Sequence, residues 1–342
     1  MRVVRWHPDL RLPDIPRVVA LGAFDGVHLG HAKTIQAMRS IANQRNAQAA
    51  ILTFDPSPRE FANGARRTGR RLTTLDEQIH YLRRLGVDLV VVFEFPGEIH
   101  SVEPDDFVRD VLVGQVNAVH VTASKTHRFG HMGRGDIDLL RALGDELGFE
   151  VEIVRSLTIG DERVSSTRIR DLLDAGNVVE AGALLGRPYA IYAPVVGGRG
   201  MGTELGFPTA NLSIPAEKIL PHDGVYAGCS AMVHGDDYSA QEQPRPAAIN
   251  VGLAPTVRGD ERIVEVHLIG EQCNLREAWL KVEFLRWLRN EREFEDLAAL
   301  TEQIGRDVDE VVAVAEAPQS EPLGEFDRVC ATDYVVRRPG WE

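Results

Sequence analysis

The sequence predicts an α/β protein in two parts, a parallel sheet covered by helices and then an antiparallel β-barrel with a late helix. Its 342 residues suit two domains, because one domain usually takes about 100 to 200 residues. In the first half, short apolar runs alternate with amphipathic stretches at helical spacing, and parallel strands need crossovers of this kind. After about Leu185, apolar runs follow one another across turn-rich segments, which is typical of an antiparallel sheet.

The parallel sheet is predicted from five short, largely apolar runs. These runs are Val18–Leu21, Ala49–Phe54, Leu89–Phe93, Ala118–Val121 and Glu150–Val154. Ligands of open parallel sheets bind beyond the carboxyl ends of the strands. We therefore expect the functional residues of this half to follow the strands directly.

The barrel is predicted from five further runs. They are Tyr189–Val196, Val225–Val233, Ala247–Val251, Ile263–Ile269 and Leu280–Leu285. A helical pattern returns at Glu291–Ile304, and a Gly-Arg-Pro turn at 186–188 separates the two rhythms. We predict one domain over residues 1–186, a second over 187–316, and an irregular C-terminal extension over 317–342.

Composition argues against several classes of partner. With 38 basic and 51 acidic residues the net charge is −13, whereas a duplex-binding surface needs clustered Lys and Arg. The most apolar run, Leu89–Phe93, is far shorter than the roughly 20 residues of a membrane span. The first residues form no secretory signal pattern. We expect a soluble cytoplasmic protein that binds neither nucleic acid nor membrane.

The densest motif is GAFDGVHLGH at residues 22–31, after the first predicted strand and before a helix. Its glycines let the backbone approach a ligand, and a helix start favours an anion. His28 and His31 can donate to phosphate oxygens and stabilise charge that develops in phosphoryl or nucleotidyl transfer. A glycine-rich turn with incidental histidines is the alternative. The candidate nucleotide-binding residues of the loop are Gly22, Phe24, Asp25 and Gly26.

A second phosphate-binding element is predicted at residues 165–170, which read SSTRIR and open a helix after the fifth predicted strand. Ser165 or Ser166 can cap that helix. The hydroxyls, including that of Thr167, can cradle a phosphate together with the guanidinium of Arg170. Alone, the segment is an ordinary capped helix. Together with HxGH, it favours nucleotide binding across one sheet edge.

In the second half, a glycine-rich stretch at residues 197–202 precedes LGFPTAN at 205–211. Backbone amides of such a flap can face phosphates. A flexible turn between strands explains the glycines equally well. The candidate binding glycines are Gly198, Gly202 and Gly206.

Three oxygen-bearing side chains complete the second candidate site. Thr209 and Asn211 alternate, so in an extended segment they share a face. Two neutral oxygens suit a magnesium ion whose charge is balanced by nucleotide phosphates. Glu265 lies within a predicted strand, where it is either a general base for a hydroxyl nucleophile or a solvent-facing residue.

Seven segments carry a family resemblance: in chain order, GAFDGVHLGH, TFDPSPRE, SSTRIR, LGFPTANL, DGVYAG, INVGLAPT and VEVHL, within about Val18 to Val314. The chain resembles the bacterial bifunctional riboflavin kinase/FMN adenylyltransferases, also called FAD synthetases. The resemblance implies a Rossmann-like nucleotidyltransferase domain followed by a flavokinase β-barrel. It also implies riboflavin, FMN and ATP as substrates, with Mg²⁺ accompanying ATP.

The resemblance also implies roles for individual residues. Thr209 and Asn211 would hold magnesium and phosphate, and Glu265 would be the base on the ribityl 5′-hydroxyl. The residues implied to hold ATP phosphates in the first domain are His28, His31, Ser166, Thr167 and Arg170.

The chain departs from the family pattern mainly in flavin-side segments. Ser124–Gly130 reads SKTHRFG where the family usually has G-x-D/N-F-x-F-G, and Ser57 stands where a histidine is expected. In the flap, Gly197 and Thr203 replace a histidine and an arginine. Two alternatives therefore stay open. One is a divergent paralogue with one activity or a modified flavin substrate, and the other is a non-catalytic flavin- or nucleotide-binding regulator.

Overall fold

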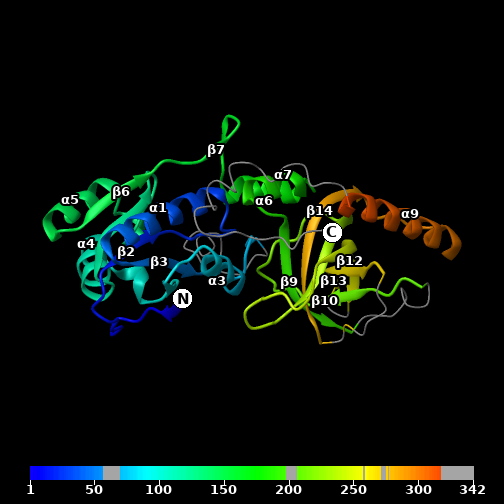
Figure 1. Ribbon diagram of the computed structural model, residues 1–342, viewed down its shortest axis with the longest axis horizontal. Helices are drawn as coiled ribbons and strands as arrows, with labels where there is room; N and C mark the ends of the chain where they lie inside the picture. The colour runs from blue at the N-terminus through cyan, green and yellow to red at the C-terminus, as the bar shows by residue number, and fades with distance from the viewer. Residues whose placement is uncertain (57–69, 198–205, 257–258, 271–274, 276, 317–342) are drawn as a thin grey trace. The chain divides into compact units, whose positions relative to one another are not determined.

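The computed structural model describes residues 1–56, 70–197, 206–256, 259–270, 275 and 277–316 (Figure 1). The described chain forms two compact units. Unit 1 comprises residues 1–56 and 78–164, and unit 2 comprises residues 70–77 and 165–316. Each unit is described by itself below.

Unit 1 is built on a six-stranded parallel sheet with the order β1-β4-β3-β2-β5-β6. Its strands are β1 Arg2–Arg5, β2 Arg17–Leu21, β3 Gln48–Asp55, β4 Leu89–Glu94, β5 Ala118–Ser124 and β6 Glu150–Val154. All five predicted strands are confirmed. The prediction missed β1, whose sequence RVVR has two apolar residues between arginines.

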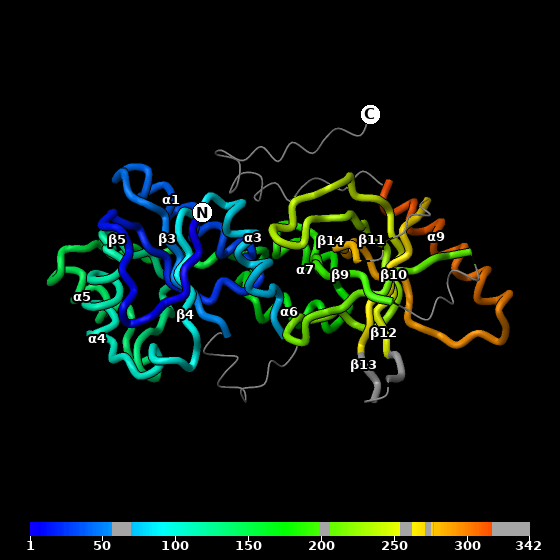
Figure 2. The backbone as a smooth tube through the Cα atoms, turned by 90° about the horizontal axis from the view of Figure 1, so that it is seen from below, coloured from blue at the N-terminus to red at the C-terminus, as the bar shows by residue number. Residues whose placement is uncertain are grey.

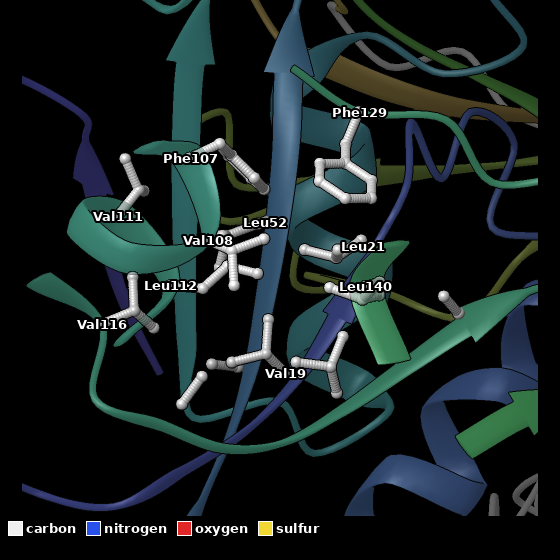
Figure 3. Packing of buried hydrophobic residues seen from close by; sticks show 14 of the residues in the cluster. Val19, Leu21, Leu52, Phe107, Val108, Val111, Leu112, Val116, Phe129 and Leu140 are labelled. Atoms are coloured by element: carbon white, nitrogen blue, oxygen red, sulfur yellow. The ribbon is translucent and has the colours of Figure 1, made fainter. Parts of the chain in front are cut away.

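Helices cover the sheet because its central strands are apolar on both faces, and every residue of β2 is buried. The helical elements are α1 Leu29–Arg45, α3 Leu75–Arg84, η1 Glu98–Ser101, α4 Pro104–Asp106, η2 Phe107–Gln115, η3 His131–Gly133 and α5 Ile137–Leu147. Figure 3 shows Val19 and Leu52 of the sheet packed with Val108 and Leu112 of η2 and with Leu140 of α5. The sheet is thereby fixed as a platform for the loops at its edge.

The strand order creates a topological switch between β2 and β5. After β2, the chain extends the sheet through β3 to β4; it then crosses over to β5 and β6 on the other side of β2. Ligands of open α/β sheets bind at such a point, beyond the carboxyl ends of the strands. The GAFDGVHLGH loop follows β2 and the Ser124–Gly130 segment follows β5, so both lie at this point.

Unit 2 contains a closed antiparallel barrel with the order β10-β13-β12-β11-β14-β9. Its strands are β9 Tyr189–Val196, β10 Ala210–Leu212, β11 Gly224–Val233, β12 Arg245–Thr256, β13 Gly259–Leu268 and β14 Trp279–Arg289. The five predicted strands are confirmed. The prediction missed β10, which has three residues and a polar centre.

The late helix is confirmed, but its predicted bounds were wrong. Helix α9 spans Leu297–Glu316 and packs against β11 and β12 (Figure 2). It begins after Asp296, whose carboxylate accepts a hydrogen bond from the N–H of Ala299 at 2.8 Å. An aspartate that caps a helix sets its start. The segment before it, from Glu291, is therefore outside the helix.

Residues before the barrel belong to unit 2 as well. Helix α6 spans Ser166–Asp174, and α7 spans Val178–Leu185 and packs against β14 and β9. The second compact unit therefore begins after Val164, whereas the sequence pattern changes from alternating helices and strands to successive strands at Gly186. The domain bounds 1–186 and 187–316 stay a prediction, and the extension 317–342 lies outside the described residues.

Segment 70–77 also belongs to unit 2, although the sequence assigns it to the first domain. The N–H of Arg71 donates to the carbonyl of Glu217 at 2.8 Å, and the N–H of Ile219 donates to the carbonyl of Arg71 at 2.9 Å. Arg71 thus forms a parallel bridge with Lys218. A short piece of the first-half sequence is therefore built into the barrel unit.

Candidate active sites

The GAFDGVHLGH loop of unit 1 has a constrained backbone. Phe24 and Val27 have φ angles of 49° and 39°, and Gly26 has a φ of 83°. Positive φ is costly for a bulky or β-branched residue and persists where the surroundings enforce it. The side chains of Phe24 and Val27 are buried, as is Asp25. Burial of these side chains holds the loop in one conformation at the end of β2.

His28 and His31 lie together at the start of α1. His28 is the N-cap, and its Nδ1 accepts a hydrogen bond from the backbone N–H of His31 at 3.2 Å. The neutral ring therefore carries its proton on Nε2, which makes Nε2 a donor. The two imidazole rings stack with centroids 3.6 Å apart. A Cβ at Gly30 would lie 3.1 Å from Cε1 of His28, so the glycine makes room for this ring.

Two buried polar side chains that the sequence analysis missed support the loop. The hydroxyl of Thr53 donates to the carbonyl of Ala23 at 3.1 Å, and Nε2 of Gln78 donates to the same carbonyl at 3.0 Å. Nε2 of Gln78 is also 3.2 Å from Oγ1 of Thr53. Both side chains are fully buried. The signal for Thr53 was a lone hydroxyl within the apolar run of β3.

The SSTRIR segment opens α6 in unit 2. Ser165 is the N-cap, and its hydroxyl accepts from the N–H of Arg168 at 3.3 Å, while Ser166 and Thr167 occupy the first turn. Nε of Arg170 donates to the carbonyl of Arg70 at 2.6 Å. The segment does not follow β6 directly as expected, because the hairpin of β7 Thr158–Ile159 and β8 Glu162–Arg163 intervenes.

The two predicted phosphate elements lie in different compact units, HxGH in unit 1 and SSTRIR in unit 2. Within unit 1, Val164 is buried, and its carbonyl lies 3.7 Å from a Cβ built at Gly30. Ser165 follows it directly.

Residues 125–128 of the altered Ser124–Gly130 segment line a pocket of about 370 Å³ beyond β5, together with the start of α5. Burial lowers the pKa of His127 to about 4. The ring is therefore uncharged at neutral pH, and it stacks parallel to Phe129 with centroids 6.3 Å apart. An uncharged aromatic ring thus stands where the resembling family has a phenylalanine. His127 therefore differs less from the family's phenylalanine in its chemical character than the change of residue type suggests.

In the barrel, Asn211 and Glu265 are directly opposed across the β10–β13 pair. Val264 and Val266 are buried while Glu265 is half-buried, so Glu265 faces away from the barrel core. Opposed residues of an antiparallel pair share a face. Thr209 lies two residues before Asn211 and is exposed. The structure therefore places the predicted base beside the predicted phosphate and magnesium residues.

The segment before β10 is anchored to β13 by a residue that the sequence analysis missed. Nδ1 of His267 donates to the carbonyl of Pro208 at 2.8 Å, and the ring of Phe207 meets the imidazole edge-on, with centroids 5.6 Å apart. Gly206 has a φ of 84°, a conformation that favours glycine. Gly198 and Gly202 lie outside the described residues.

The donor set beside Glu265 fits magnesium held jointly with a nucleotide. Among the described residues, no group of three or more His, Cys, Asp or Glu side chains is arranged to hold a metal. Thr209 and Asn211 instead offer a hydroxyl and an amide, both neutral oxygens. Mg²⁺ is commonly bound by few protein ligands together with substrate phosphates. These residues therefore suit a metal ion that arrives with ATP.

The fold and the two sites define a class of protein. Paired imidazoles at a helix start can stabilise phosphate charge, and a carboxylate opposed to an amide can act as a general base, so the chain suits a two-module enzyme that transfers phosphate-containing groups. A family model described as FAD synthetase matches residues 13–168, and one described as riboflavin kinase matches residues 185–315. The chain belongs to the bifunctional riboflavin kinase/FMN adenylyltransferase family.

Individual relatives agree with this assignment. The bifunctional riboflavin kinase/FMN adenylyltransferase of Escherichia coli strain K12 is 34% identical over 309 residues, covering 90% of this chain and 96% of that protein. The enzyme of the same name from Bacillus subtilis strain 168 is 33% identical over 317 residues, covering 91% and 96%.

A solved structure shares the whole architecture. A crystal structure from Streptococcus pneumoniae, named a macrolide-efflux protein, has a TM-score of 0.81 and 27% identity, covering 91% of this chain and 98% of that one. Within the described part of the present chain, no helix is long and apolar enough to cross a membrane.

Proposed function

We propose that this chain makes FAD from riboflavin in two ATP-dependent steps at separate sites. The barrel transfers the γ-phosphoryl group of ATP to the 5′-hydroxyl of riboflavin, forming FMN and ADP. The first module transfers AMP from a second ATP to the phosphate of FMN, forming FAD and pyrophosphate. The observation that carries the proposal is the cross-strand placement of Glu265 beside Asn211, in a chain that matches both family models.

In the kinase step, Glu265 removes the proton of the ribityl hydroxyl as its oxygen attacks the γ-phosphorus. Thr209 and Asn211 would hold a magnesium ion together with the ATP phosphates, and Asn211 opposes Glu265 across the strand pair. Mg²⁺ neutralises charge on the phosphate oxygens when it is bound. The bond between His267 and Pro208 keeps this segment beside β13.

In the adenylyl step, the attacking phosphate of FMN is already anionic, so the protein needs no general base. Its task is to position the reactants and stabilise the leaving pyrophosphate. Nε2 of His28 donates to a phosphate oxygen, supported by His31 and the start of α1. Ser166, Thr167 and Arg170 at the start of α6 are the further residues that we propose to bind phosphate.

Two assays on the purified chain test the proposal. Riboflavin with excess Mg-ATP should give FMN and then FAD, and supplied FMN with Mg-ATP should give FAD and pyrophosphate. Formation of FMN from riboflavin, with no FAD in either assay, would leave a kinase alone, as the altered Ser124–Gly130 segment allows. Flavin binding without any product would leave a regulator.

Thr53→Val is expected to lower FAD formation from supplied FMN about tenfold, because it removes one of the two hydrogen bonds to the carbonyl of Ala23 and leaves Nε2 of Gln78 with one fewer acceptor. FMN formation from riboflavin should be unchanged. Initial rates of the two reactions check this. Thr34→Val is the matched control, because the hydroxyl of Thr34 bonds within its own helix, to the carbonyl of Gly30. Equal losses in both reactions would contradict a local role of Thr53.

A further inference from the structure

Arg70 binds helix α6 at two side chains within unit 2. Its backbone carbonyl accepts a hydrogen bond from Nε of Arg170 at 2.6 Å. Its guanidinium binds the carboxylate of Asp174, with Nη1 at 2.9 Å from Oδ1 and Nη2 at 2.8 Å from Oδ2. We propose that Arg70, held by Asp174, is a positioning residue that orients Arg170 for the transfer of AMP to FMN. This inference rests on the proposed adenylyltransferase function.

The two contacts come from the same face of α6. Arg170 and Asp174 are four residues apart on this helix, and side chains at that spacing are neighbours on the helix surface. A guanidinium that binds both oxygens of a carboxylate is fixed in orientation as well as in distance. Because one residue makes both contacts, the ion pair with Asp174 restricts the carbonyl of Arg70 that receives Arg170.

Arg70 and α6 are both attached to the barrel unit. The residue after Arg70 is Arg71, which forms a parallel bridge with Lys218. The other end of α6 is attached as well, because the N–H of His222 donates to the carbonyl of Leu173 at 2.9 Å. The bond between Arg70 and Arg170 therefore joins two segments that other backbone hydrogen bonds already hold in the same unit.

The bond from Arg170 to a carbonyl orients its guanidinium and leaves it charged. A guanidinium is planar, and four of its five N–H donors lie on the terminal nitrogens beyond Nε. A neutral acceptor at Nε fixes that plane without cancelling the positive charge, whereas the nearby carboxylate of Asp174 is bound to Arg70. Donors oriented before the reaction stabilise developing charge with little reorganisation. Arg170 is thereby prepared for the charge on the leaving pyrophosphate.

Asp174→Ala tests the proposal, because it breaks the ion pair and leaves both Arg170 and the carbonyl that it contacts in the chain. It should lower kcat for FAD formation from supplied FMN about fivefold, near the most that an exposed ion pair contributes. KM for ATP should change less than twofold, because the lost interaction acts mainly in the transition state. Arg70→Ala should give the same loss. FMN formation from riboflavin should be unchanged in both variants.

Glu146→Ala is the matched control. Glu146 of α5 accepts two hydrogen bonds from Nη2 of Arg109 on η2, at 2.7 and 2.8 Å, and this pair is exposed as well. Its loss should leave both reactions unchanged.

A double-mutant cycle with Arg170→Ala shows whether Asp174 acts through Arg170. Arg170→Ala should lower FAD formation about hundredfold, because it removes a donor to developing charge. Adding Asp174→Ala to that variant should lower the rate no further, since a residue that acts only by orienting Arg170 has no effect in its absence. A merely structural role of Asp174 would instead give the same fivefold loss in both backgrounds.

The outcomes separate this inference from the function on which it rests. Absence of FAD formation by the parent chain would overturn the adenylyltransferase function and this inference together. A parent chain that makes FAD, with equal losses from Asp174→Ala in the presence and absence of Arg170, would overturn the positioning role alone. FAD formation at the parent rate by Asp174→Ala or by Arg170→Ala would overturn that role as well.

Discussion

Replacing Glu265 with glutamine should abolish FMN formation while FAD formation from supplied FMN continues at the parent rate. Glutamine keeps the size of the side chain and its place between the opposed residues of β10 and β12. It cannot accept the proton of the ribityl hydroxyl, and loss of a general base costs about 10² to 10⁴ in rate. Separate assays of the two half-reactions measure the effect.

A control substitution shows whether the effect belongs to the site. Glu293→Gln removes a carboxylate from an exposed position after β14 and should leave both reactions unchanged. Loss of both activities in Glu265→Gln would argue against two separate sites. FMN formation at the parent rate would remove Glu265 from the role of base.

Lys218→Met should destabilise the barrel unit by about 3–5 kcal/mol, because it leaves the carboxylate of Glu77 buried without its ion-pair partner. Nζ of Lys218 lies 2.5 Å from Oε2 of Glu77, and each side chain is 1% exposed. Lys218 also donates to the carbonyl of Leu72 at 2.8 Å. Glu77 accepts from the N–H groups of Thr74 at 2.9 Å and Tyr192 at 3.2 Å. The pair thus joins segment 70–77 to β9.

The double variant Glu77→Gln/Lys218→Met distinguishes the cost of an unpaired buried charge from the cost of altered side-chain packing. It removes both charges, so it should lose less stability than Lys218→Met alone. Arg306→Met breaks the exposed pair with Glu302 and should cost less than about 1 kcal/mol. Thermal unfolding followed by tryptophan fluorescence, to which Trp279 and Trp287 on β14 contribute, measures all three. An unchanged unfolding midpoint in Lys218→Met would contradict the account.

Local sequence patterns predicted most of the fold because most strands here are long enough to show one. β2 and β9 are apolar runs whose burial follows from their composition. β1 and β10 are too short or too polar to carry such a signal, and only neighbouring strands define them. The place of segment 70–77 depends on its pairing with Lys218, more than 140 residues away along the chain. Periodicity holds no information about a contact of that kind.

The candidate sites divide in the same way. Motif chemistry predicted His28, Asn211 and Glu265 as candidate site residues, because histidines in a glycine-rich loop and polar residues among apolar strand positions stand out. The supporting residue Thr53 was missed, since its hydrogen-bond partners, Ala23 and Gln78, lie elsewhere in the chain. A hydroxyl inside an apolar strand was a visible signal for Thr53.

The most direct test of the central claim is to follow labelled phosphorus from ATP into flavin. Riboflavin is incubated with the purified chain and Mg-ATP labelled at either the γ- or the α-phosphorus, and the flavins are then separated. Two sites working in series predict the γ-label in both FMN and FAD and the α-label in FAD alone. No label in any flavin, or an α-label absent from FAD, would contradict the account.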